Sequence, residues 1–218
     1  MPASPRRAPH LRIVGDHAPG ELSEASLAEA LQRREPWAAE AVWKRYAPSV
    51  YGLLARGLGR GAEPEALTQA VFFRAFTRIR SLEEPAALRS FVYSHAAIVL
   101  RRELRRRWLR RVFSRSRRAV TSDEAKWLLD RPMRLVLARL YDVLDQLSPT
   151  DRVIFSLRQL EGLSYAELAE VLGKPVAFVK RKVTRVSARL EVLVRSDPLL
   201  DHYVAQPRLS EAEQQEGA

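Results

Sequence analysis

The sequence contains no cysteine, which excludes disulfides, thiolate metal sites and cysteine nucleophiles and agrees with a reducing compartment. Its four histidines lack the spacing of metal ligands. Gly57, Gly59 and Gly61 follow no expected strand, so they do not form a dinucleotide fingerprint. We therefore expect no metal, no cofactor and no catalytic set, which argues against an enzyme.

Long apolar runs are also missing. The longest nearly apolar stretch, Phe91 to Leu100, is about half of the roughly 20 residues needed to cross a bilayer. Arg6 and Arg7 are not followed by the apolar segment of a secretory signal. We expect no membrane insertion and a cytoplasmic location.

Positive charge is abundant and unevenly distributed. Lysine and arginine number 37 against 26 acids, and ten of the arginines lie between Arg101 and Arg118 with one acid, Glu103. A basic chain favours polyanions such as nucleic acid or an acidic membrane surface. We disfavour a membrane role because these arginines lie on an expected helix whose apolar face is needed for the core. The other alternative is that the run of arginines is simply a solvated helix face.

Apolar residues recur at helical spacing throughout the central part of the chain, and no alternating run indicates a strand. We predict an all-α fold with two small helical domains joined by a flexible linker, the second domain a helix-turn-helix. The expected segments are a disordered tail (1–22), a first domain (23–111), a linker (112–134), a second domain (135–196) and an acidic tail (197–218).

The second domain carries three helix signals. Ser148 and Pro149 favour a helix start, Ser164 to Glu167 forms a capping box, and Gly173 favours a helix end. A short helix, a turn and a longer helix from about Pro175 to Arg195 have the order of a helix-turn-helix.

The longer helix has two distinct faces. Val179, Val183, Val186 and Leu190 point inward, which leaves basic and apolar residues at the position where a recognition helix meets base edges. The residues expected to bind DNA are Ala177, Phe178, Lys180, Arg181, Lys182 and Arg185. A helical hairpin with a solvated basic face is the alternative.

Four sequence blocks together carry a family resemblance. They are LTQAVFFRAF (67–76), LRSFVY (88–93), LRQLEGLSYAELAEVLG (157–173) and VKRKV (179–183). Across about residues 24–195 the chain resembles the extracytoplasmic-function (ECF) group of alternative sigma factors, the subunits that direct bacterial RNA polymerase to promoters.

The resemblance implies partners for each domain. The first domain would bind core RNA polymerase through Leu67, Gln69, Phe72 and Phe73 and the downstream, minus-ten promoter element through Arg101, Arg102, Arg105 and Arg106. The second would read the upstream, minus-thirty-five element, and the linker would run toward the polymerase active site. An anti-sigma factor is a further implied partner.

Two departures from the family pattern stand out. Ala66 and Ala70 replace acids in the polymerase-binding motif, and on the fourth helix Ile98 and Arg102 replace an asparagine and an acid. They leave open a sigma-derived DNA-binding regulator that no longer initiates transcription. A sigma-fold protein that acts by sequestering an anti-sigma factor is a separate alternative, and the net charge of +11 argues against it.

Overall fold

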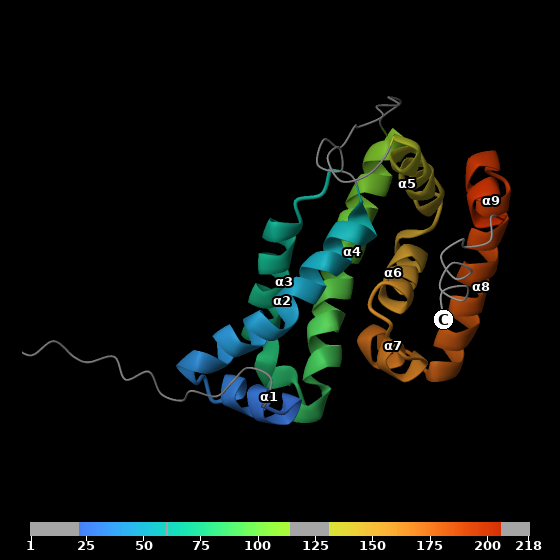
Figure 1. Ribbon diagram of the computed structural model, residues 1–218. Coiled ribbons are helices and arrows are strands. Elements are labelled where there is room, and N and C mark those ends of the chain that lie inside the picture. Colours follow the sequence, from blue (N-terminus) through green and yellow to red (C-terminus); the bar gives the residue numbers. More distant parts are fainter. Residues whose placement is uncertain (1–21, 60, 114–130, 206–218) are drawn as a thin grey trace, which may run out of the picture.

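The computed structural model describes residues 22–59, 61–113 and 131–205, and within these ranges the chain is helical and contains no strand (Figure 1). The prediction of an all-α fold is confirmed. The α-helices are α1 (Glu24–Gln32), α2 (Pro36–Leu58), α3 (Pro64–Arg78), α4 (Leu88–Phe113), α5 (Arg131–Leu144), α6 (Pro149–Gln159), α7 (Tyr165–Leu172), α8 (Val176–Arg195) and α9 (Pro198–Ala205).

The first four α-helices form the N-terminal half. Pro36 and Pro64 stand in the first turns of α2 and α3, where the missing proline N–H costs no intrahelical hydrogen bond. Two short 3-10 turns, Ile79–Ser81 and Pro85–Ala87, lead into the long α4. The inward faces of these helices form a core whose members include Val42, Val50, Leu53, Leu54, Val71, Phe72, Leu88 and Val92.

The remaining helices form the C-terminal half, and the expected start and stop signals are present. The Ser148 side chain accepts the backbone N–H of Asp151 at the start of α6. Gly173 ends α7 in the left-handed conformation, with φ +58°. The predicted capping box and helix order of the helix-turn-helix are confirmed.

The two halves share one hydrophobic core. Helices α6 and α7 pack against α4, beside which they lie in Figure 1. Ile154, Leu157 and Leu168 belong to the same cluster as Leu54 and Leu100. Helix α8 begins in this cluster and ends in a second, smaller one that it forms with α5 and α9. The two expected domains therefore pack together as one body in this structure.

The boundaries of the expected linker and C-terminal tail need correction. Helix α4 continues to Phe113 and α5 begins at Arg131, so both ends of the expected linker (112–134) are helical, while residues 114–130 lie outside the described ranges. Helix α9 lies within the expected acidic tail (197–218), and its Leu200 is only 3% exposed. Asp197 caps α9 by accepting the N–H groups of Leu199 and Leu200, so this acid starts a packed helix.

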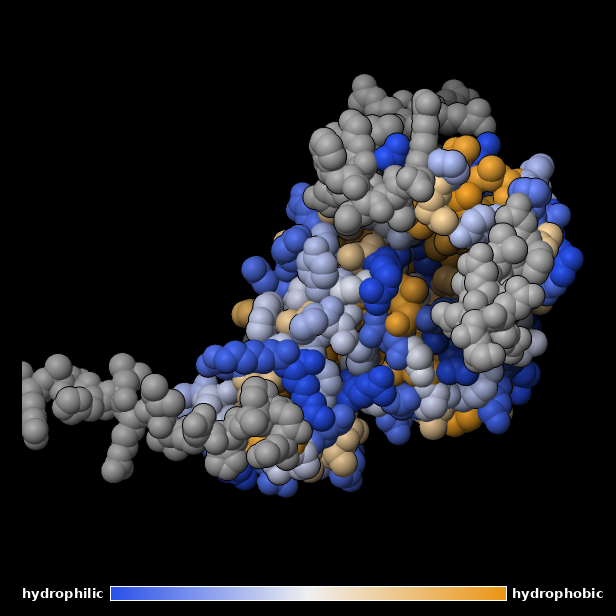
Figure 2. Space-filling model, in the orientation of Figure 1, coloured by the Kyte–Doolittle hydropathy of each residue, from blue (hydrophilic) through white to orange (hydrophobic). Residues whose placement is uncertain are grey.

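The described surface is mainly hydrophilic on the face shown in Figure 2, where hydrophobic residues gather at the upper right, near α5. Among the described helices, none combines the length and the apolar character that crossing a membrane requires. The expected tail 1–22 lies outside the described ranges except for Leu22.

The close approach of Gly59 to Tyr141 predicts a stability difference between two glycines. Gly59 has φ +66°, and an added Cβ would lie 2.4 Å from the Tyr141 ring; Gly61 has φ +65° with no heavy atom within 4 Å. We expect Gly59→Ala to lower the free energy of unfolding by about 3 kcal/mol and Gly61→Ala by about 1–2 kcal/mol, because only the first adds a clash to backbone strain. Urea denaturation measures both; equal losses would show that contact with Tyr141 is unimportant.

Candidate nucleic-acid and protein interfaces

The start of helix α7 is held in place by local hydrogen bonds. Ser164 Oγ accepts the Glu167 N–H at 3.2 Å, and Glu167 Oε2 accepts the Ser164 N–H at 2.7 Å. These hydrogen bonds and the Arg89 guanidinium lower the pKa of the Glu167 carboxyl. The capping box therefore remains ionised near neutral pH and keeps the start of α7 in place.

The outward face of α8 is basic and accessible. The inner stripe of Val179, Val183, Val186 and Leu190 is buried, as predicted. Five of the six residues expected to bind DNA are exposed: Ala177, Phe178, Lys180, Arg181 and Arg185. The structure thus places these five side chains on the solvent-exposed face of α8, whose opposite face packs in the core.

Lys182, the sixth expected DNA contact, lies in a different environment. Its side chain is half-buried, and its Nζ is 2.6 Å from Oδ1 of Asp151 in the first turn of α6. The expectation that Lys182 faces DNA together with Arg181 therefore needs correction. At 100° per residue, position 182 falls beside the inner stripe of Val179 and Val186, so its role in packing could have been inferred from the helical spacing.

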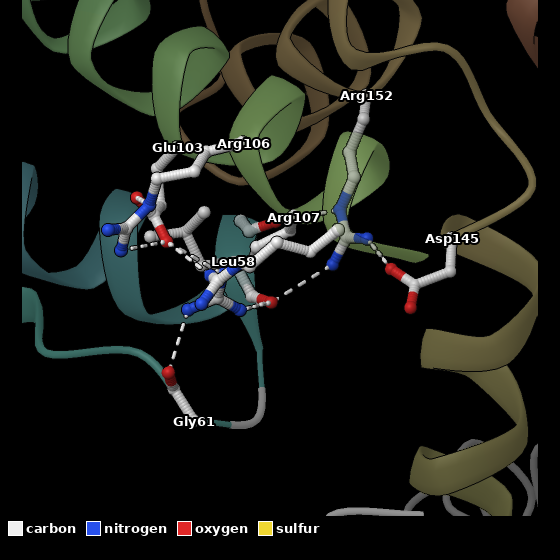
Figure 3. Close-up of polar contacts among 9 residues, drawn as sticks. Leu58, Gly61, Glu103, Arg106, Arg107, Asp145 and Arg152 are labelled. Carbon is white, nitrogen blue, oxygen red and sulfur yellow. Dashed lines mark hydrogen bonds and ion pairs between the residues drawn. The ribbon is translucent and has the colours of Figure 1, made fainter. Parts of the chain in front are cut away.

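The arginines of α4 divide into two groups. Glu103 is buried and contacts Arg106 and Arg107 (Figure 3). Arg110 pairs with the same carboxylate at 3.6 Å. Burial raises the pKa of the Glu103 carboxyl, but the hydrogen bonds from Arg106 and Arg107 outweigh this effect and lower it. Arg106, expected to contact DNA phosphates, is thus already ion-paired at 2.8 Å. The structure assigns it to an intramolecular pair.

The other group, Arg101, Arg102 and Arg105, is exposed and forms no ion pair or hydrogen bond with the described part of the chain. Together with Ile98 and Trp108 these arginines line a cleft of about 760 Å³. Ser148, Pro149 and Thr150, at the start of α6, form the opposite wall. These three expected DNA contacts are therefore available to an external anion.

A groove of about 520 Å³ lies between α2 and α3. Gln69, one of the expected polymerase contacts, lines it together with Trp43 and Tyr51. The aromatic pair was not predicted, although both residues fall off the inner stripe of α2 and so had to be exposed.

The four expected polymerase contacts on α3 do not share one environment. Phe73 is 72% exposed and Gln69 is exposed, whereas Leu67 is half-buried. Phe72 is 1% exposed, and its ring lies 4.7 Å from the ring of Trp43. The expectation that Phe72 contacts a partner therefore needs correction. The buried Phe72 side chain packs against Trp43, which lines the groove.

A buried arginine joins the two halves. Arg152 of α6 is 2% exposed, and its Nε donates to the Gly57 carbonyl at 2.8 Å while its Nη2 donates to the Leu58 carbonyl at 3.3 Å. Asp145 neutralises it through an ion pair (Figure 3). Since the last carbonyls of a helix have no intrahelical partner, Arg152 completes the hydrogen bonding at the end of α2.

Further polar contacts join the halves along α4. The Tyr93 hydroxyl donates to Glu161 at 2.7 Å, and Ser90 donates to Glu170 at 2.7 Å. Arg89 pairs with Glu167. Burial and the neighbouring Glu161 raise the pKa of the Tyr93 phenol, so it remains a hydrogen-bond donor. These partners are far apart in sequence, and no local pattern indicated them.

No group of histidine and acidic side chains suited to a metal ion occurs among the residues for which the structure gives positions. The charged clusters of this region instead join arginines to acids, as around Glu103 and Asp145.

The buried environment of Arg152 predicts a large stability effect. We expect Arg152→Met to lower the free energy of unfolding by about 3 kcal/mol, because the Gly57 carbonyl loses its buried donor. Arg111→Met is the matched control, since Arg111 pairs with the same Asp145 at 2.8 Å but is half-exposed; its loss should cost less than about 1 kcal/mol. Chemical denaturation compares the two, and a small loss for Arg152→Met would contradict the assigned role.

The sequence matches two family descriptions: Sigma-70 region 2 over residues 42–110 and Sigma-70, region 4 over residues 137–190. Together these matches span more than half of the chain. They correspond to the two halves, α2–α4 and α5–α8.

Similar proteins of known name agree with these matches. The ECF RNA polymerase sigma-E factor of Haemophilus influenzae is 26% identical over 184 residues, which cover 78% of this chain and 95% of that protein. The RNA polymerase sigma-H factor of Pseudomonas aeruginosa is 24% identical over 194 residues, covering 81% and 95%.

The fold also resembles a solved structure, that of CnrH in complex with the cytosolic domain of CnrY. The TM-score is 0.60 at 20% identity, covering 80% of this chain and 98% of that one. The two matched sigma-70 regions, their order along the chain and the relatives that are covered over 95% of their length all support one assignment. The chain belongs to the sigma-70 family of RNA polymerase sigma factors and is of the extracytoplasmic-function type.

Proposed function

We propose that this ECF sigma factor directs RNA polymerase to its promoters through three separate surfaces: α8, the free arginines of α4 and the α2–α3 groove. The observation that carries the proposal is the outward face of α8, which is basic, exposed and held on a buried valine stripe. ECF sigma factors act in promoter-specific transcription initiation, and both sigma regions are present in this chain.

The upstream promoter element is assigned to α8. Arg181 and Arg185 can donate to guanine in the major groove, and Phe178 can contact a thymine methyl group. Lys180 is exposed beside them and can neutralise a phosphate. Because Lys182 is engaged by Asp151, we leave it out of the DNA-binding set.

The downstream element is assigned to Arg101, Arg102 and Arg105. Their guanidinium groups are exposed and have no described acidic partner, so they can bind phosphates and release counterions. Trp108 lies on the same wall of the cleft and offers a ring on which an unpaired base can stack.

Core polymerase is assigned to the α2–α3 groove and the adjoining Phe73. Ala66 and Ala70 are both exposed on α3, so the acids usual in the family are replaced at the surface. Binding here therefore depends more on aromatic and apolar contact, supplied by Trp43, Tyr51 and Phe73.

The chemistry of RNA synthesis belongs to the polymerase, and this chain contributes binding energy and specificity. We therefore propose that it has no catalytic activity of its own and acts in the cytoplasm, where core polymerase works. An anti-sigma factor is a further partner that we propose for it.

A sigma-derived regulator that acts without polymerase is the second candidate, favoured by Ala66 and Ala70. In vitro transcription with purified core polymerase on a pooled genomic library separates the two candidates. Start sites that appear only with this chain and share a two-part upstream motif establish the sigma factor. No new start sites, with DNA binding intact, would establish the regulator.

Adjacent residues of α8 should differ in their effect on DNA binding. We expect Arg181→Ala to weaken binding to upstream-element duplex by about 1–3 kcal/mol while sparing random duplex, because a base contact carries sequence preference. Lys182→Ala removes the same charge but should weaken neither complex by more than about 0.5 kcal/mol beyond any loss of folding, since its ammonium group faces Asp151. Fluorescence anisotropy at fixed salt measures both, and the reverse order would refute this orientation of α8.

Adjacent phenylalanines of α3 should also separate binding from folding. We expect Phe73→Ala to weaken association with core polymerase at least about tenfold and to leave the melting temperature nearly unchanged, because its ring is exposed. Phe72→Ala should instead cost about 3–5 kcal/mol of stability, because its ring fills the core. Biolayer interferometry and thermal melting test the pair. Unchanged polymerase binding by Phe73→Ala would exclude this face of α3.

A further inference from the structure

The cleft between α4 and α6 is formed by both halves of the molecule, whereas the downstream promoter contacts proposed above use α4 alone. Its α4 wall consists of one stripe, since helical spacing places positions 98, 101, 102, 105 and 108 on a single face. Its opposite wall, Ser148 to Thr150, comes from the C-terminal half. The cleft of about 760 Å³ therefore exists only while the two halves are packed together. Ile98 and Arg102, both departures from the family pattern, line it.

Among the described residues, no acid lines this cleft. Two acids of the helices that form its walls are already engaged: Glu103 by Arg106 and Arg107, and Asp151 by Lys182. The start of α6 adds the positive end of a helix dipole. Three neighbouring guanidinium groups repel one another without a counter-charge, so a multiply charged anion stabilises them.

The cleft also presents apolar surface next to this charge. Trp108 is 44% exposed, and Ile98 is exposed about three turns before it on the same stripe. An indole ring beside guanidinium groups suits a planar base that carries phosphates, because the base stacks while the phosphates receive charge-assisted hydrogen bonds. The volume is also in the range of small-ligand sites.

We propose that this cleft binds a free nucleoside polyphosphate, with its base against Trp108 and its phosphates on Arg101, Arg102 and Arg105. Ser148, Pro149 and Thr150 form the other wall, so a ligand that fills the cleft also contacts the start of α6 and stabilises the packed arrangement of the two halves. The same arginines are assigned above to promoter phosphates, so the nucleotide competes with DNA for them. This regulatory consequence rests on the proposed function, whereas nucleotide binding itself does not.

Isothermal titration calorimetry of the full chain with GTP and with ATP, at fixed ionic strength and without DNA, tests the site. We expect saturable binding at one site per chain. Arg105→Gln and Trp108→Leu should each weaken it at least about tenfold, through loss of a phosphate contact or of stacking. Arg110→Gln is the matched control, because it removes the same charge from the same helix but its guanidinium pairs with Glu103; it should change affinity less than about twofold.

Thr150→Glu tests the contribution of the second half, because it places a carboxylate on the α6 wall while the exposed Thr150 side chain leaves the core untouched. It should weaken GTP binding at least about tenfold by repulsion of the phosphates. Inorganic tripolyphosphate should bind at least about tenfold more weakly than GTP, since it lacks a base. Circular dichroism melts confirm that each variant is folded.

Three results would overturn the proposal. Equal losses in Arg105→Gln and Arg110→Gln would indicate non-specific attraction, and tripolyphosphate binding as tightly as GTP would remove the role of Trp108. Undetectable GTP and ATP binding beside tight, Trp108-dependent binding of a short single-stranded oligonucleotide would assign the cleft to DNA. Arg181-dependent duplex binding, measured in parallel, reports on the proposed function independently, so failure of one leaves the other standing.

Discussion

The carboxyl end of α2 is the constraint on which the packing of this molecule depends. The Gly57 and Leu58 carbonyls have no partner within their helix, and burial deprives them of water. Arg107 of α4 and Arg152 of α6 supply the missing donors. One arginine comes from each half, so satisfying a single helix end joins the two sigma regions. Packing of Leu54 and Leu100 against Ile154 and Leu157 then excludes water around these bonds.

Buried or half-buried acids determine which arginines take part in packing. Glu103 and Asp145 each engage several guanidinium groups, which explains why a strongly basic helix can pack at all. Within the described ranges, the arginines on the opposite stripe of α4, Arg101, Arg102 and Arg105, pair with no acid, and their side chains line the cleft. Arginines that pair with Glu103 and arginines that line the cleft thus alternate along α4.

Local features of the chain could be predicted where the physics is local. Caps at Ser148 and Ser164, the left-handed Gly173 and the buried stripe of α8 each depend on neighbours within one or two turns. The predicted roles of Lys182 and Phe72 needed correction because each side chain packs against a residue far away in sequence, Asp151 and Trp43 respectively. Arg106 pairs with Glu103 three residues before it, a contact that the helical spacing could have indicated. Helix α9 was included in the expected tail because residues 197–218 are rich in acids, whereas its packing depends on the buried Leu200.

The sequence by itself determined the helical fold, the helix-turn-helix and the family, because hydrophobic period, capping residues and motif order are all written within short stretches of chain. Only the tertiary structure decided that the two halves share a core, which arginines are free, and that a basic cleft forms between α4 and α6. Contacts such as Arg152 with Gly57 join residues far apart in sequence. They depend on how helices pack, a property that no local pattern contains.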